Sequence, residues 1–221
     1  MDIIKYDVYK GPNLGVYLAV NDRNVLIPMG FAESKAEKIA KYLDVDYLYT
    51  SISNTRLIGA LSIMNNKGIL IPKTAYLDEY DFLKKETGLE IGILDSKFTA
   101  LGNLICANDK GAIVSPLFSE NDCQTIKEVL GVKIIQKKIA GFNQVGSVMI
   151  ANNSGAVIHS EADEEDMKSF GNLLGVKIEQ SSVNGGIPYV SSGILANNHN
   201  LVIGSLTTGP EIMMLTRAFL N

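Results

Sequence analysis

Five copies of one short pattern, spaced at nearly constant intervals, restrict this chain to an array of five similar structural units. Each copy has a small residue, five mostly apolar residues, an asparagine, and two or three polar residues before a second apolar run. The asparagines, separated by 44, 43, 44 and 45 positions, are Asn21, Asn65, Asn108, Asn152 and Asn197. A period in this range indicates supersecondary units that cannot bury their apolar faces alone and therefore pack on one another.

Each unit begins with a predicted β-hairpin. The first strands are expected at 16–20, 60–64, 103–107, 147–151 and 192–196, and the second strands at 25–27, 69–71, 112–114, 156–158 and 201–203. The second strands are apolar on consecutive residues, so we expect both of their faces to be covered. Three residues after each repeat asparagine stand Asn24, Gly68, Gly111, Gly155 and Asn200. Because only Gly and Asn occupy that column, we expect a left-handed turn residue there.

A helix follows each hairpin, and its apolar stripe repeats with the same spacing. In the first unit the stripe is Ala36, Ile39 and Leu43, at i, i+3 and i+7 of one helix. The equivalent residues are Tyr80, Leu83 and Thr87; Cys123, Ile126 and Leu130; Met167, Phe170 and Leu174; and Ile212, Leu215 and Phe219. Asp44, Gly88, Gly131 and Gly175 are expected to end the first four helices, after which a third strand begins.

The two ends of the chain favour a closed ring. The chain stops where the fifth unit should start its third strand, and counting back one period from Tyr47 reaches Ile3. The N-terminal strand at 2–9 is therefore expected to complete the fifth blade, which removes exposed strand edges. An open solenoid would need polar capping repeats, which the sequence lacks. We expect one α/β domain over 1–221, a closed five-bladed propeller with repeats at 10–50, 51–94, 95–137, 138–181, and 182–221 plus 1–9.

Composition narrows the possible partners. The chain is 46% hydrophobic and carries a formal net charge of −4, which argues against broad nucleic-acid binding and suits a basic protein partner. No secretory signal or membrane-spanning run is evident, and two cysteines are too few for a disulfide framework. We therefore expect a cytoplasmic protein without membrane or DNA contacts.

Closed five-unit α/β rings of this kind constitute the pentein fold, which includes enzymes that modify guanidino groups with a Cys nucleophile and a His. In the repeat alignment Cys106 falls at the centre of a strand and Cys123 on the inner stripe of a helix, so both are expected to be core residues. His199 falls at a hairpin tip and His159 just past a second strand. No Cys–His pair, metal-ligand cluster or cofactor motif is evident, although contact across the ring leaves a guanidino-modifying enzyme as the alternative.

Short motifs in the third and fifth repeats resemble those of a known protein family. Residues 99–103 (TALGN), 108–109 (ND), 115–116 (SP) and 207–211 (TTGPE) are similar to the translation initiation factor 6 family, in order along the whole chain. The resemblance implies a non-catalytic pentein that binds the intersubunit face of the large ribosomal subunit, prevents association with the small subunit and takes part in large-subunit biogenesis. It also implies that the main contact is a ribosomal protein near the sarcin–ricin loop, and we expect the free protein to be monomeric.

Contact residues are predicted where the repeat symmetry breaks. Asn103 is the only large amide in the column after the repeat glycine, and Arg56 is the only charged residue in its column. With their neighbours and column mates Ala60, Gly102 and Ser147, they form the predicted partner-binding set. An internal hydrogen bond of the Asn103 amide is the alternative explanation for that residue.

Overall fold

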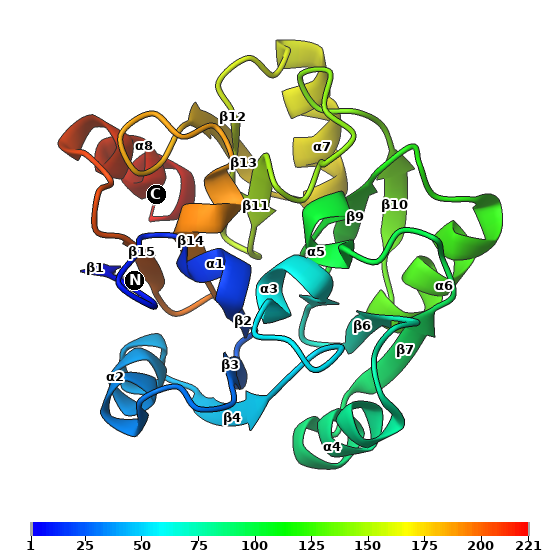
Figure 1. The fold of residues 1–221 in the computed structure, drawn as a ribbon. Helices are drawn as coiled ribbons and strands as arrows, with labels where there is room; N and C mark the ends of the chain where they lie inside the picture. The colour runs from blue at the N-terminus through cyan, green and yellow to red at the C-terminus, as the bar shows by residue number, and fades with distance from the viewer. Residues whose placement is uncertain (1, 221) are drawn as a thin grey trace.

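The computed structural model describes residues 2–220, which form five three-stranded sheets arranged as blades around a central axis (Figure 1). In blades 1 to 5 the strands are β2 (Ala19–Val20), β3 (Asn24–Pro28) and β4 (Asp46–Thr50); β5 (Ile63–Met64), β6 (Gly68–Pro72) and β7 (Glu90–Leu94); β8 (Ile105–Ala107), β9 (Gly111–Val114) and β10 (Lys133–Gln136); β11 (Met149–Ala151), β12 (Gly155–His159) and β13 (Lys177–Ser181); and β14 (Ile194–Ala196), β15 (Leu201–Gly204) and β1 (Ile3–Tyr6). The middle strand pairs antiparallel with its hairpin partner and parallel with the third strand. The pentein ring predicted from the repeats is therefore confirmed.

The N-terminal strand closes the ring, as predicted. β1 pairs in parallel with β15, and the register runs from Ile3 opposite Leu201 to Tyr6 opposite Gly204. The strand is shorter than the expected 2–9, because the chain turns at Val8, which pairs only with Gly11. The first strand of the chain thus becomes the third strand of the last blade.

One outer helix follows the middle strand of each blade. These helices are α2 (Glu33–Leu43), α4 (Leu77–Thr87), α6 (Glu120–Leu130), α7 (Glu164–Leu174) and α8 (Gly209–Phe219). The first four end at Asp44, Gly88, Gly131 and Gly175, as predicted, and all four of these residues have left-handed backbone, with φ between 57° and 65°.

The core is divided into five clusters, and each fills the seam between two consecutive blades. The central stripe residues of the outer helices (Ile39, Leu83, Ile126, Phe170 and Leu215) are all 0% exposed. In the seam where the ring closes, Ile39 of blade 1 packs in one cluster with Leu195 and Val202 of blade 5. Each outer helix therefore joins its own blade to the preceding one.

A second set of short helices surrounds the axis, and the sequence did not reveal it. They are α1 (Leu14–Tyr17), α3 (Ile58–Leu61), α5 (Leu101–Leu104), a turn at 145–148, and the 3-10 helix η1 (Val190–Gly193). The expected first strands were wrong in their opening residues, which are helical or turn-forming. The glycine in each unit permits close packing: a Cβ on Gly59 would lie 2.1 Å from the Gly15 carbonyl oxygen.

The expected left-handed turn residue after each repeat asparagine was also wrong. Among residues 2–220 the positive-φ positions include none of Asn24, Gly68, Gly111, Gly155 and Asn200. Close packing explains the glycines instead, since a Cβ on Gly68 would lie 2.1 Å from the Val129 carbonyl oxygen of the next outer helix. At Asn200, by contrast, the side-chain Nδ2 donates to the Tyr42 carbonyl oxygen of α2 at 2.7 Å.

The repeat asparagines themselves form a closed hydrogen-bonded ring. Each Oδ1 accepts the main-chain N–H groups two and three residues ahead, which fixes the hairpin turn. Each Nδ2 donates to the main-chain carbonyl of the asparagine in the next blade, at 2.8–3.3 Å. One residue type thus shapes the turn within a blade and holds adjacent blades together, which explains its recurrence.

Candidate partner-binding face

The ring has two different faces. Each inner strand runs from an inner helix to a hairpin, so the inner helices lie at one end of the axis and the hairpins at the other. We call the first the inner-helix face, formed by the inner helices, the loops that precede them and the starts of the outer helices. The second is the hairpin face, formed by the five hairpin turns and the ends of the outer helices. Figure 1 shows α1, α3 and α5 grouped around the axis.

Four of the five predicted site residues lie together on the inner-helix face. Gly102 and Asn103 belong to α5, and the Ser147 N–H donates to the Asn103 carbonyl oxygen at 3.2 Å. Ala60 lies on the neighbouring α3, next to Gly59, whose carbonyl oxygen would be 1.9 Å from a Cβ on Gly102. The half-buried Asn103 side chain makes no hydrogen bond within the described residues, so its amide is free to meet a partner.

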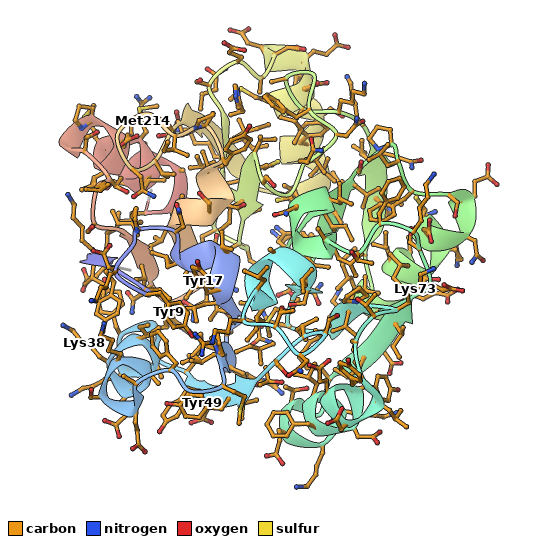
Figure 2. The ribbon with its side chains drawn as sticks, viewed as in Figure 1. Tyr9, Tyr17, Lys38, Tyr49, Lys73 and Met214 are labelled. Atoms are coloured by element: carbon orange, nitrogen blue, oxygen red, sulfur yellow. The ribbon has the colours of Figure 1, made fainter. Side chains whose placement is uncertain are left out.

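Arg56 lies on the same face, and its immediate neighbour is an aromatic group. The guanidinium lies over the Tyr9 ring, 5.5 Å from the ring centroid. The Tyr9 ring in turn meets Tyr17 at 5.0 Å and Phe31 at 5.6 Å, both edge-on; Figure 2 shows Tyr9 and Tyr17 side by side. Tyr9 comes from the loop that closes the ring, and this contact could not be read from the repeat columns.

Four of the loops on the inner-helix face adopt left-handed backbone at residues other than glycine. The non-glycine positive-φ residues in these loops are Tyr9, Lys10, Ser53, Asn54, Ala140 and Asn184, with φ between 48° and 63°. Each loop is closed by an isolated pair of β-bridge residues. Such backbone costs about 1–3 kcal/mol per residue unless the surroundings fix it, and it is concentrated at functional sites.

Buried carboxylates hold two of these loops in place. Glu79 of α4 accepts hydrogen bonds from the N–H groups of Ser53 and Asn54 at 2.8 and 2.9 Å, and from the Ser51 hydroxyl. Glu211 of α8 likewise accepts the N–H groups of Gly185 and Gly186. These carboxylates could have been found in the sequence, because an acidic residue recurs at the equivalent position of four repeats, as Glu79, Asp122, Asp166 and Glu211.

The hydrogen bonds outweigh the cost of burying these carboxylates. Burial alone would raise the pKa of the Glu211 carboxyl, but bonds from Thr208, Ser182, Gly186 and Gly185 lower that pKa from 4.5 to about 2. The pKa of Glu79 is lowered in the same way, by bonds from Ser51, Tyr76, Asn54 and Ser53 that overcome its burial. The carboxylates are therefore ionised anchors for the loops.

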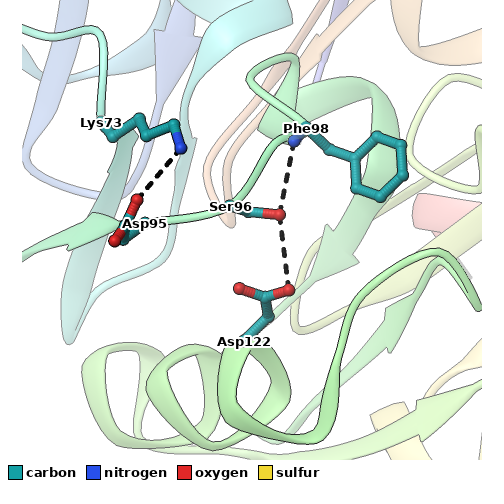
Figure 3. A network of polar contacts seen from close by, with 5 residues as sticks. All are labelled: Lys73, Asp95, Ser96, Phe98 and Asp122. Atoms are coloured by element: carbon teal, nitrogen blue, oxygen red, sulfur yellow. Dashed lines mark hydrogen bonds and ion pairs between the residues drawn. The ribbon is translucent and has the colours of Figure 1, made fainter.

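The loop before α5, which carries Asn103, is built differently. It lacks a bridge-closed turn; Ser96 donates to Asp122 of α6 at 3.4 Å and accepts the Phe98 N–H at 3.3 Å (Figure 3). Beside it Lys73 and Asp95 form an exposed ion pair at 3.1 Å. Asp122 is thus the third carboxylate that anchors a loop of this face.

Exposed apolar side chains gather on the inner-helix face. Of the eleven large hydrophobic residues exposed among residues 2–220, nine lie in its loops and helix starts: Tyr9, Met29, Leu57, Tyr76, Leu77, Leu117, Ile187, Tyr189 and Leu206. Met213 and Ile93, on an outer helix and a third strand, are the other two. Exposed apolar residues concentrated on one face of a folded chain mark a site of interaction.

Carboxylates border this apolar face, because all five outer helices start there. The exposed carboxylates of their first turns are Glu33, Asp78, Glu120, Glu164 and Glu165, whereas Glu79, Asp122, Asp166 and Glu211 in the same turns are buried. The acidic run at 161–166 thus opens α7, as its sequence indicates, and Asp166 pairs with Lys137. A face that presents exposed apolar side chains and carboxylates together is complementary to a partner that is apolar and basic.

The central cavity lacks the groups that guanidino chemistry needs. It has a volume of about 110 Å³ and is lined by glycines, alanines, aliphatic side chains, Met64, Met149, Ser62, Ser191 and Cys106. Neither histidine lines it, and burial raises the pKa of the Cys106 thiol to about 12. Cys123 is buried in α6, and burial raises its pKa as well. Both cysteines therefore lie in the core, where the repeat alignment placed them.

Two further features of residues 2–220 bear on the site. No group of three or more His, Cys, Asp or Glu side chains in this part of the chain is placed to hold a metal ion. None of its helices has the length and apolar character needed to cross a bilayer.

Comparison with known proteins identifies the family. The sequence profile of the eIF-6 family matches residues 3–218. The chain belongs to the eIF-6 family. It is 77% identical to translation initiation factor 6 of Nitrosopumilus maritimus over the full length of both chains. The factor of Cenarchaeum symbiosum is 59% identical over 99% of each chain. The resemblance found in the repeat motifs is therefore confirmed, and this eIF-6 family member is related to translation factors.

A comparison with solved structures shows that an enzyme has a similar fold. The N-terminal domain of ArgZ, an arginine dihydrolase of cyanobacteria, superposes with a TM-score of 0.50 over 76% of this chain and 68% of that domain. The two sequences are only 11% identical, so the similarity concerns the fold alone. The eIF-6 family member therefore shares the pentein fold with this arginine dihydrolase.

Proposed function

We propose that this protein binds the intersubunit face of the large ribosomal subunit through its inner-helix face and thereby prevents association with the small subunit. Membership of the translation initiation factor 6 family supports a role in translation. The observation that carries the proposal is the gathering of nine exposed apolar residues, together with exposed carboxylates, on that one face. A ribosomal protein with a basic, partly apolar surface, near the sarcin–ricin loop, is the partner that such a face fits.

The proposal includes a role in large-subunit biogenesis, because a protein that occupies the joining face can also keep immature subunits apart. It places the protein in the cytoplasm, as a monomer when free. Asn103 is the main contact and Arg56 the second, and Ala60, Gly102 and Ser147 complete the contact set. The unpaired amide of Asn103 supports its assignment to the partner rather than to the interior of the ring.

We further propose that the protein is not an enzyme. A Cys nucleophile needs a base within hydrogen-bond reach and a thiolate accessible at neutral pH. The central cavity offers neither, because its only thiol is buried with a raised pKa and no histidine or carboxylate lines it. The lining of the central cavity therefore argues against guanidino-group modification, the alternative that the fold suggests.

Sedimentation tests the proposal directly. The protein should co-sediment with purified large subunits, be absent from joined ribosomes, and reduce joining when added first. Leu57→Ser should weaken binding, because Leu57 is 40% exposed on the inner-helix face. Met213→Ser is the matched control, since Met213 is 58% exposed but lies within α8 away from that face. If the wild-type protein does not bind large subunits, the proposed function is wrong. If both variants lose binding equally, the inner-helix face is not the binding surface.

A further inference from the structure

A groove between blades 3 and 4 departs from the acidic character of the rest of the chain. It opens near the hairpin face, has a volume of about 830 Å³, and is lined by Lys110, Lys127 and Lys133 of blade 3 together with Ser169 and Asn172 of α7. Its remaining lining residues are Gly131, Val132, Ile135 and Leu173, so no carboxylate lines it. Three cations therefore share one groove in a protein whose net charge is −4.

The repeat symmetry provides an internal comparison for this groove. The equivalent groove of blade 1 is lined by Asp22, Arg23, Ala40, Lys41, Asp44, Val45 and Asp46. Blade 3 lies two repeats, or 87 positions, further along the chain. There the positions of Ala40, Asp44 and Asp46 are occupied by Lys127, Gly131 and Lys133. Over the same seven columns, which in blade 3 also include Asp109 and Glu128, the side-chain charge changes from −1 in blade 1 to +1 in blade 3.

No other blade repeats this combination. Blade 3 is the only unit with a cation at all three of the repeat positions that Lys110, Lys127 and Lys133 occupy. In chain order, the Lys110 position holds Arg23, Lys67, Lys110, Ser154 and His199; the Lys127 position holds Ala40, Lys84, Lys127, Gly171 and Thr216; and the Lys133 position holds Asp46, Glu90, Lys133, Lys177 and, from the N-terminal strand, Asp2. The fold does not require the three lysines, since other residue types occupy each column in the remaining blades. Their concentration in blade 3 therefore needs an explanation other than folding.

The three ammonium groups are available to a ligand. All three lysines are exposed, and none takes part in an ion pair among the described residues. Lys110 donates one hydrogen bond, to the Gly175 carbonyl oxygen at 3.2 Å, and keeps further N–H groups for a ligand. From blade 2, Lys67 reaches the same rim and donates to the Gly131 carbonyl oxygen at 2.9 Å, adding a fourth positive charge.

We propose that this groove binds the phosphate backbone of an RNA strand. The lysines line an open groove rather than converge on one buried point, which suits a chain of charges better than a single ion. Lysine ammonium groups act as point charges toward phosphate, and the Ser169 hydroxyl and Asn172 amide can donate to phosphate or sugar oxygens. No aromatic side chain lines the groove for base stacking, so the contact reads the backbone and is independent of sequence.

This inference is independent of the proposed function, because it concerns a different part of the ring and is tested on free RNA. Binding of a fluorescent 20-nucleotide oligouridylate is measured by anisotropy at several salt concentrations between 50 and 200 mM. The variant is Lys127→Ala with Lys133→Ala. The control is Lys84→Ala with Lys85→Ala, which removes the same charge from the exposed end of α4. Thermal unfolding of both variants checks that the ring stays folded.

We expect the groove variant to bind about tenfold more weakly at the lowest salt. The slope of log affinity against log salt should fall by about 1.4, because single strands lose about 0.7 per phosphate contact removed. The control should bind like the wild type. Wild-type protein that does not bind RNA would overturn the proposal, as would equal losses in the two variants. Competition by poly-glutamate at the same charge concentration as RNA would assign the groove to an acidic protein segment instead.

Discussion

The Asn197 side chain donates from Nδ2 to the main-chain carbonyl oxygen of Asn21, 176 positions away, and this bond completes the asparagine ring. The same amide donates to the Leu43 carbonyl oxygen at 2.8 Å, which ties the end of α2 to the fifth hairpin. Asn197 is 2% exposed, so these bonds are shielded from water. The two ends of a five-unit array are thus joined by the same contact that joins every other pair of units.

Asn197→Ala should cost about 2–4 kcal/mol of unfolding free energy. It removes two donated bonds and the two accepted from the N–H groups of His199 and Asn200, and a buried group left unpaired costs about 1–3 kcal/mol. Urea denaturation measures the loss. His199→Ala at the exposed tip of the same hairpin is the control and should change stability by less than about 0.5 kcal/mol. A similar small effect of both variants would contradict the structural role of the ring.

Ring closure by the first strand gives a second prediction. Deleting residues 2–9 should expose the edge of β15 and remove Val8, which is 1% exposed and packs in the core. The truncated chain should melt at a much lower temperature and scatter light as it aggregates. Lys5→Ala, in the same strand but exposed, should behave like the wild type. Native stability in the truncated chain would mean that the strand is dispensable for the ring.

The sequence predicted the ring, and its successes and failures have physical reasons. Strands, outer helices and closure follow from columns that recur at fixed intervals, because every unit must bury the same face. The inner helices were missed because four residues are too few to show a helical period, and the apolar run continues through Val16 and Tyr17 into the strand. The expected turn geometry at Gly68 failed because its glycine serves a contact with α6 that lies in the next repeat.

The candidate site was predictable only in part. Asn103 and Ser147 occupy one column, and the ring places such residues side by side around its axis. The contact of Arg56 with Tyr9 depends on the loop that closes the ring, which has no equivalent column. The hydrogen bonds that Glu79 accepts from Ser53 and Asn54 link residues about half a repeat apart, so the periodicity shows the acidic column but not its partners.

The cysteines give a third prediction. Neither thiol should react with Ellman's reagent in the native protein, because both are buried and burial raises the pKa of each. Cys106→Ala and Cys123→Ala should each lose about 1 kcal/mol or more of stability through lost packing, without losing partner binding. Hydrolysis of a guanidino compound that disappears in either variant would show that the protein is an enzyme.

Acid should loosen the inner-helix face. The pKa of Glu211 is lowered to about 2 in the fold, so its contribution is fully present above about pH 4.5 and is lost as the pH falls toward 2. Because solvent screens part of the interaction, we expect a loss of about 2 kcal/mol between these limits. Denaturation at pH 6, 4, 3 and 2 measures it. Glu211→Gln should be less stable than the wild type at pH 6 and show a flatter pH dependence; an unchanged profile would assign the acid sensitivity to other groups.

Asn103 is the sharpest probe of the proposed contact. Asn103→Ala leaves the glycine contacts and main-chain bonds of α5 in place, and it removes an amide that has no hydrogen-bond partner in the described residues. A lost interfacial hydrogen bond is worth about 0.5–1.5 kcal/mol, so affinity for large subunits should fall up to about tenfold while the melting temperature stays nearly constant. Gln124→Ala, on the exposed side of α6, is the amide-matched control. Full binding by Asn103→Ala would remove this residue from the site, whereas a lowered melting temperature would return its amide to the interior of the ring.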